Sequence, residues 1–192
     1  MTTRPPAIID ERVVHDGWSR FRIVRVRAAD GTVLQREVED HGPAVAVLPY
    51  DAERRVATLV TQMRPPVMVA TGDMALTEVP AGLLEEGEDP AACARREAME
   101  EAGLRLGVLE PLGALWPMPG LSTERMHLFL AAYTQADRIA DGGGLAAEHE
   151  DIVVEESSLA ALAAGIDSGA LTDMKTVVLL LQLRHRRPDL FA

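Results

Sequence analysis

Three glutamates, Glu97, Glu100 and Glu101, share one arc of a predicted helix in the stretch GLLEEGEDPAACARREAMEEAGL, residues 82 to 104. Like charges three or four residues apart each destabilise a helix by roughly 0.2–0.5 kcal/mol. A helix that gathers such charges is well explained if a cation binds among them. Because carboxylate oxygens are the ligands that Mg²⁺ and Mn²⁺ prefer, the spacing indicates a metal site.

The ends of this helix are marked by residue types that suit them. Asp89 can cap the N-terminus, Pro90 suits the first helical position, and Gly103 suits the left-handed residue that ends a helix. At about 100° per residue, the glutamates fall on a different arc from a narrow apolar stripe. That stripe, which would let the helix lie close to a sheet, consists of Ala91, Ala94, Ala98 and Ala102.

The composition is that of a globular protein with one sizeable domain, with or without a small appendage. Of its 192 residues, 47% are hydrophobic and 26% are charged. The net charge of −11 opposes binding to a phosphate backbone, so duplex DNA and long RNA are excluded as expected partners. A small anionic substrate still fits if metal ions reverse the local charge.

We expect a cytoplasmic protein without a membrane partner. No apolar run approaches the roughly 20 residues of a membrane span, and the first residues, MTTRPPAIIDER, lack the apolar segment of a signal peptide. Cys93 is the single cysteine, so no intramolecular disulfide is expected.

Alternating and apolar runs predict the elements around the helix. Asp30-Gly31 separates two alternating runs and predicts a hairpin within a small β unit at residues 1–42. The following strands are expected at residues 44–50, 56–62, 106–115, 126–134 and 152–155. Two helices are expected over SSLAALAAGI and DMKTVVLLLQLRHRR, after a long irregular segment at residues 135–151.

The acidic stretch resembles the Nudix box, the signature of hydrolases that cleave a nucleoside diphosphate linked to another group. Gly82, Glu88 and the run from Arg96 to Leu104 fill every fixed position, with Ala98 at an aliphatic one. The rest of the chain is similar to the branch that acts on ADP-ribose and on nucleotide sugars such as GDP-mannose. The segments that carry this similarity are DGW at 16–18, QMR at 62–64, EVPAGLLE at 78–85, GGGLAAEHEDI and MKTVVLLLQ.

The resemblance implies an α/β fold, a Nudix α/β/α sandwich with a mixed sheet at residues 43–192. A small antiparallel β N-terminal domain at residues 1–42 would precede it, helping to build a homodimer and a wall of the substrate site. Two or three Mg²⁺ or Mn²⁺ ions per site are implied. Their ligands would be Glu97, Glu101, Glu150 and the carbonyl of Ala81.

The same resemblance suggests the other site residues. Arg96 would orient the glutamates, and its i,i+4 spacing from Glu100 suits an ion pair; Glu100 itself would be either a ligand or a residue that positions the ligands. Glu148, on the long loop, would be the base that activates water, although an acidic loop that only aids solubility is the alternative. The implied substrate-binding residues are Gln62, Arg64, Glu78 and Pro119.

The function implied is hydrolysis of the pyrophosphate bond of a nucleoside diphosphate sugar, of ADP-ribose or GDP-mannose type, to nucleoside monophosphate and sugar phosphate. The sequence does not indicate whether the base of the substrate is adenine or guanine. Two alternatives are a house-cleaning hydrolase of nucleoside triphosphates and a non-catalytic nucleotide-sensing module. The long β-rich N-terminus disfavours the first, and the complete set of box glutamates disfavours the second.

Overall fold

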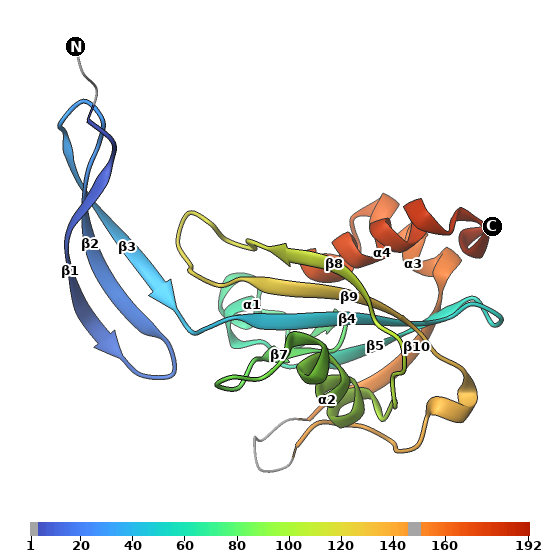
Figure 1. Cartoon of the computed structure of the whole chain (residues 1–192). Helices are drawn as coiled ribbons and strands as arrows, with labels where there is room; N and C mark the ends of the chain where they lie inside the picture. The colour runs from blue at the N-terminus through green and yellow to red at the C-terminus, as the bar shows by residue number, and fades with distance from the viewer. Residues whose placement is uncertain (1–3, 146–150) are drawn as a thin grey trace. The chain divides into compact units, whose positions relative to one another are not determined.

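A computed structural model of the chain describes residues 4–145 and 151–192. The chain forms two compact units, of which the larger comprises Ala44–Leu115 and Met126–Ala192. Its mixed sheet has the order β10-β5-β4-β9-β8, with β6 beside β5 and β7 beside β4; β4 and β9 are parallel (Figure 1). The strands are β4 (Ala44–Asp51), β5 (Val56–Gln62), β6 (Leu76–Glu78), β7 (Ala81–Leu83), β8 (Glu110–Leu115), β9 (Met126–Ala132) and β10 (Val153–Ser158).

Helices cover both faces of this sheet, which confirms the predicted α/β/α sandwich. On one face, leucines of α3 and α4 pack against Leu48 and Leu130; on the other, alanines of α2 pack against Val45 and Val47. All eight residues of β4 are buried because both faces are covered. The helices are α1 (Pro65–Thr71), α2 (Pro90–Ala102), α3 (Leu159–Ser168) and α4 (Met174–Arg186), with 3-10 turns η1 (Gln135–Asp137) and η3 (Pro188–Phe191).

One helix in this unit was not expected, and the expected start of one strand was wrong. Pro65–Thr71 forms α1, which begins with two prolines at its first positions, where a proline costs no helical hydrogen bond. Strand β8 begins at Glu110 rather than at residue 106. The preceding residues instead serve α2, since Arg95 donates two hydrogen bonds to the carbonyl of Gly107.

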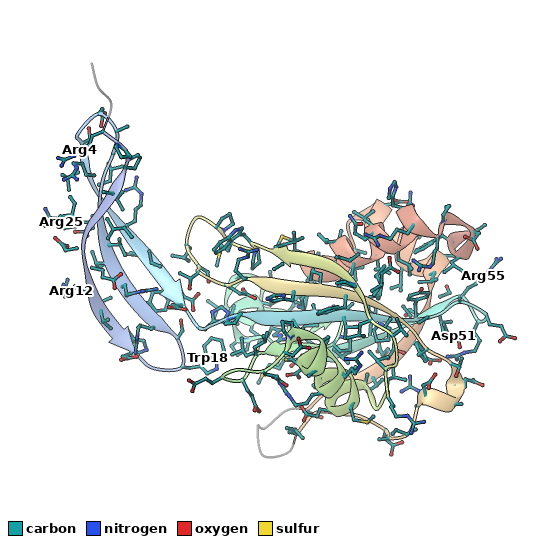
Figure 2. All side chains as sticks on the ribbon, in the orientation of Figure 1. Arg4, Arg12, Trp18, Arg25, Asp51 and Arg55 are labelled. Atoms are coloured by element: carbon teal, nitrogen blue, oxygen red, sulfur yellow. The ribbon has the colours of Figure 1, made fainter. Side chains whose placement is uncertain are left out.

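The smaller unit consists of Met1–Pro43 together with Trp116–Arg125. Its antiparallel sheet has the order β1 (Ala7–Asp16), β2 (Arg20–Arg27) and β3 (Val33–Asp40). The hairpin predicted at Asp30-Gly31 is present, with Gly31 at φ 89° in a loop of five residues. Side chains such as Arg25 project from these strands into solvent (Figure 2).

A buried carboxylate holds the loop 116–125 on β3 within this smaller unit. Glu39, 8% exposed, accepts hydrogen bonds from Ser19, from the Ser122 hydroxyl at 2.6 Å and from His41 Nδ1 at 2.7 Å. The backbone of Glu39 also bonds to Leu121 and Thr123. Trp18 stacks on His41 and is 78% exposed, so it is not a core residue in this chain.

None of the helices in the described part of the chain is long and apolar enough to cross a membrane.

Candidate metal and active site

Helix α2 is bounded as its sequence predicts. The Asp89 carboxylate accepts hydrogen bonds from the Ala91 and Ala92 amides, and Gly103 adopts a left-handed φ of 67°. The glutamates, however, do not all lie apart from the alanine stripe. Glu97 and Glu101 border it and are only 9% and 2% exposed, whereas Glu100 lies further round and is half-buried. The helix therefore carries two carboxylates into the body of the domain.

Arg96 is the centre of an ion-pair cluster at the start of this acidic face. Its Nη1 donates to Glu97 at 2.7 Å and to Glu100 at 3.1 Å, while Nε and Nη2 both donate to the Glu88 carboxylate at 3.1 Å. We call these four residues the Arg96 cluster. The hydrogen bond from Arg96 holds the pKa of Glu88 at about 2, and the same bond raises the pKa of Arg96. One cation thus serves three carboxylates.

Strand β7 lies against the two buried glutamates. A side chain at Gly82 would collide with the Glu97 carboxylate, so any other residue at this position would displace that carboxylate from its present place. The Ala81 amide donates to Glu101 Oε2 at 3.0 Å, and Gln62 Nε2 lies 3.5 Å from Glu101 Oε1. Of the residues predicted from the sequence, Gln62 and Ala81 are therefore brought to Glu101.

Arg64 and Glu78, predicted as substrate residues, form an ion pair. Glu78 is 1% exposed and accepts a hydrogen bond from Arg64 Nε at 2.6 Å. Its other oxygen pairs with Lys175, which also donates to Asp173 at 3.0 Å. Sequence analysis assigned no role to Lys175 or Asp173, because nothing local indicates that the start of α4 meets β6.

Burial and neighbouring charges act in opposite directions on Arg64. Burial lowers its pKa, but the hydrogen bond and charge of Glu78, with the charges of Glu101 and Asp173, leave the pKa raised. Arg64 is therefore within electrostatic reach of both Glu101 on α2 and Asp173 at the start of α4. Among the described residues, the only hydrogen bond of its side chain is made by Nε, and this side chain is 38% exposed.

A family model described as the NUDIX domain matches residues 40–186, most of the chain. The chain belongs to the Nudix family.

Curated Nudix relatives match nearly the whole chain. GDP-mannose pyrophosphatase of Cronobacter sakazakii is 40% identical over 93% of this chain and 95% of its own length. The enzyme of the same name from Citrobacter koseri is 36% identical over 90% of this chain and 92% of its own length. That from Escherichia coli O1:K1 is 34% identical over 95% of this chain and 98% of its own length. A solved structure titled "Crystal structure of ADP compounds hydrolase" superposes with a TM-score of 0.77, covering 98% of this chain and 97% of that one. At 17% identity, this likeness shows the fold alone.

Nudix hydrolases generally use divalent metal ions, and the residues on α2 include the carboxylates that such ions prefer as ligands. Glu97 and Glu101 provide buried oxygen donors one helical turn apart, beside a glycine that leaves room for them. In residues 4–145 and 151–192, no group of three or more His, Cys, Asp or Glu side chains is placed to hold a metal. Mg²⁺ usually takes only one or two carboxylates, completing its shell with water and substrate phosphates. The two buried carboxylates are therefore enough for one such ion.

The glycine run 142–144 fastens the long loop to the end of the Nudix helix. Gly143 N donates to the Glu101 carbonyl at 2.9 Å, and Gly144 N donates to the Glu100 carbonyl at 3.0 Å. Gly142, at φ 75°, lies so close that a side chain would collide with the Glu101 backbone. These amides satisfy carbonyls that a helix C-terminus leaves without partners. The run is thus a cap for α2.

Three predicted residues are not placed by these contacts. Glu148 and Glu150 lie outside the described residues, so their roles as base and ligand stay predictions. Pro119 belongs to the loop 116–125 of the smaller unit, and its substrate contact also stays a prediction.

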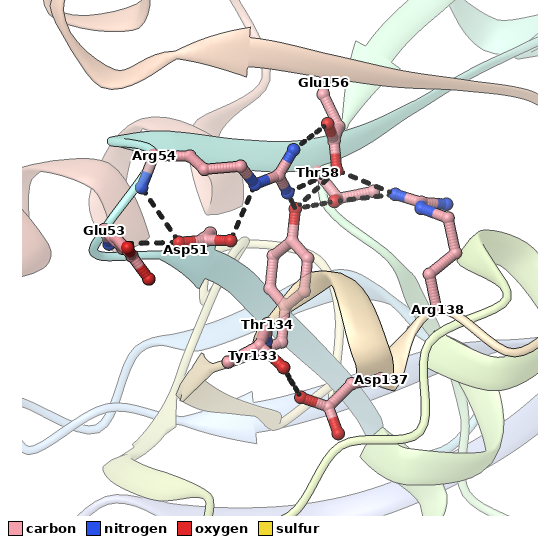
Figure 3. Close-up of polar contacts among 9 residues, drawn as sticks. All are labelled: Asp51, Glu53, Arg54, Thr58, Tyr133, Thr134, Asp137, Arg138 and Glu156. Atoms are coloured by element: carbon pink, nitrogen blue, oxygen red, sulfur yellow. Dashed lines mark hydrogen bonds and ion pairs between the residues drawn. The ribbon is translucent and has the colours of Figure 1, made fainter.

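A second polar cluster surrounds Glu156 on β10 (Figure 3). Its carboxylate accepts hydrogen bonds from Arg54 at 2.7 and 2.9 Å, from Tyr133 at 2.8 Å and from Arg138 at 3.1 Å. Arg54 also bonds to Asp51 at 2.7 Å. We call these five residues the Glu156 network. The bonds from Arg54 hold the pKa of Glu156 at about 2, although burial acts against this.

Proposed function

We propose that this Nudix protein hydrolyses the pyrophosphate bond of a nucleoside diphosphate sugar, of GDP-mannose or ADP-ribose type. The products would be a nucleoside monophosphate and a sugar phosphate. The observation that carries the proposal is the excess of carboxylate around Arg96, next to the buried pair Glu97 and Glu101. Relatives of 34–40% identity that are named GDP-mannose pyrophosphatase support the substrate class.

The metal would be Mg²⁺ or Mn²⁺, with two or three ions per site. Glu97 and Glu101 would hold them, joined by Glu150 and the Ala81 carbonyl. When bound, the ions would neutralise phosphate charge and lower the pKa of an attacking water. An all-oxygen donor set supports these hard cations over softer ones.

The chain's own residues would orient the reactants. Arg96, which binds both Glu97 and Glu100, would keep their carboxylates in fixed directions, so Glu100 positions a ligand or becomes one. Glu148 would remove the proton from the attacking water. Arg64 is held by Glu78 through Nε, which leaves Nη1 and Nη2 to donate to phosphate oxygens.

The remaining proposed contacts concern the pocket wall and the assembly. Gln62 would reach substrate or metal-bound water beside Glu101, and Pro119 would contact the substrate from its loop. We propose a cytoplasmic homodimer in which residues 1–42 provide dimer contacts and part of the substrate wall. Exposed apolar residues on β1 support this: Ile8, Ile9, Val13 and Val14.

A mass-spectrometric screen of nucleotide sugars, dinucleotides and nucleoside triphosphates with Mg²⁺ tests the proposal. We expect monophosphate and sugar phosphate from GDP-mannose or ADP-ribose. Release of pyrophosphate from triphosphates, or no product from any compound, would contradict it.

The variant Glu148→Gln tests whether Glu148 is the base that activates water. Its turnover rate should fall far more than its substrate binding weakens, and an unchanged rate would place the base elsewhere.

A further inference from the structure

A cleft of about 660 Å³ lies in the larger unit between α1, β6 and the connection from α3 to α4. This volume is within the range of about 300–1,000 Å³ that is usual for small-molecule sites. Two carboxylates, Asp73 and Asp173, and several threonine hydroxyls form its polar side, while Leu76 and Met174 contribute apolar surface. None of the thirteen residues that line it is cationic or aromatic.

The cleft adjoins the residue proposed to bind phosphate. Arg64 is the N-cap of α1, and the next turn of that helix contributes Pro66 and Val67 to the cleft wall. Arg64 is also linked to the wall through side chains, since Glu78 bridges it to Lys175, which pairs with Asp173. Arg64 is thus joined to the cleft wall both along α1 and through a series of paired side chains.

The residues that line the cleft suit the sugar of a nucleotide sugar better than its phosphates or its base. A phosphate is disfavoured, because the exposed Asp73 carboxylate repels it and no lining residue is cationic, whereas Asp173 already pairs with Lys175. A purine is disfavoured because the lining has no aromatic ring on which it could stack. A neutral sugar suits the cleft, since its hydroxyls can donate to carboxylates and threonines while its C–H face packs on apolar side chains.

We propose that this cleft is the subsite for the sugar of the substrate, with Asp73 as a direct acceptor from a sugar hydroxyl. The inference rests on the proposed function. Asp73 is exposed, and its carboxylate bonds to the Thr71 hydroxyl at 2.8 Å, which leaves its second oxygen for a ligand.

The test compares GDP-mannose with the β-methyl ester of GDP, which has the same diphosphate linkage but no sugar. Asp73→Ala should raise KM for GDP-mannose about tenfold, as loss of a charge-assisted hydrogen bond predicts. Its kcat and its kinetics with the methyl ester should be unchanged. Ala170→Leu, which fills the cleft, should have the same effect. Asp167→Ala is the matched control, because this aspartate lies on α3 outside the cleft and pairs with Arg184.

Equal changes for both compounds, or no change for either, would overturn the sugar subsite. Calorimetric titration with α-mannose 1-phosphate in the absence of Mg²⁺ provides a second readout, in which Asp73→Ala should bind about tenfold more weakly than wild type. Equal affinity of the two proteins would also overturn it. Because the titration needs no turnover, an inactive wild-type enzyme would count against the proposed function alone.

Discussion

The Arg96 cluster and the Glu156 network are both built from arginines and carboxylates, but their charges balance differently. Around Arg96, one cation serves Glu88, Glu97 and Glu100, and the buried Glu101 is nearby. The Glu156 network instead sets Arg54 and Arg138 against Asp51 and Glu156, with a tyrosine hydroxyl completing the bonds.

This difference separates a site from a structural junction. Like charges near one another oppose folding unless a cation joins them, and we propose that a metal ion compensates the excess of acid on α2. The Glu156 network has no such excess, and its bonds join the β4–β5 turn, the residue that follows β9, β10 and the segment after η1 (Figure 3). Changes in the first cluster should therefore affect turnover, and changes in the second should affect stability.

The largest effect is expected for Glu101→Gln. Removing one charged ligand should lower kcat by about three orders of magnitude or more, the equivalent of several kcal/mol of lost charge stabilisation. Steady-state kinetics with Mg²⁺ would measure this, and circular dichroism should show an unchanged fold. Glu86→Gln, on the exposed turn before α2, is the matched control and should keep normal activity. Near-normal activity of Glu101→Gln would contradict the proposal that Glu101 is a metal ligand.

Arg96→Lys should have the next largest effect. Lysine keeps the charge but cannot donate from three nitrogens to Glu88, Glu97 and Glu100 at once. We expect kcat to fall by about 10- to 100-fold and the Mg²⁺ concentration for half-maximal rate to rise, as for other residues that orient metal ligands. If only thermal stability changed, Arg96 would have a structural role like that of the Glu156 network.

Arg138→Met should lower the stability of the protein and leave its turnover nearly unchanged. The substitution removes hydrogen bonds to Glu156 and to the Ala102 carbonyl, so the free energy of unfolding should decrease by about 1–3 kcal/mol. Urea denaturation would measure the loss, while kcat should stay within about threefold of wild type, or less than 1 kcal/mol. Arg105→Met, an exposed arginine near the same helix end, is the control. A large fall in kcat would show that the network also positions the last turn of α2.

The smallest effect concerns acid stability. Glu88 and Glu156 both have a folded-state pKa of about 2, below the value of about 4.3 expected when unfolded. Their contribution to stability is therefore complete above that unfolded value and is lost as pH falls from about 4 through 2. Glu88→Gln and Glu156→Gln should each flatten this part of the stability–pH curve, measured by urea midpoints. The curve of Glu86→Gln should match wild type.

Local patterns explain why helix α2 was predictable. Helix α2, its two ends and its alanine stripe depend on contacts between residues at most four or five apart, and these follow from sequence. Gln62, Arg64 and Glu78 were implied as substrate-binding residues only by family resemblance, and the contacts of Arg64 with Glu78 and of Gln62 with Glu101 were not predicted. Helix α1 was missed because prolines and a glycine suggested an irregular segment.

The sequence by itself determined helix α2 with its acidic face and the main apolar strands, because capping, spacing and apolar runs act over short distances; the family and the mixed α/β architecture were implied by the resemblance of the acidic stretch to the Nudix box. Only the tertiary structure decided which distant residues meet. Lys175 pairs with Glu78 across 97 positions, and Arg54 pairs with Glu156 across 102. Such pairs depend on strand register and on how helices dock against a sheet, and a shift of one residue would turn a strand's side chains to the other face. For the same reason, the cleft beside Arg64 has no counterpart in any local motif.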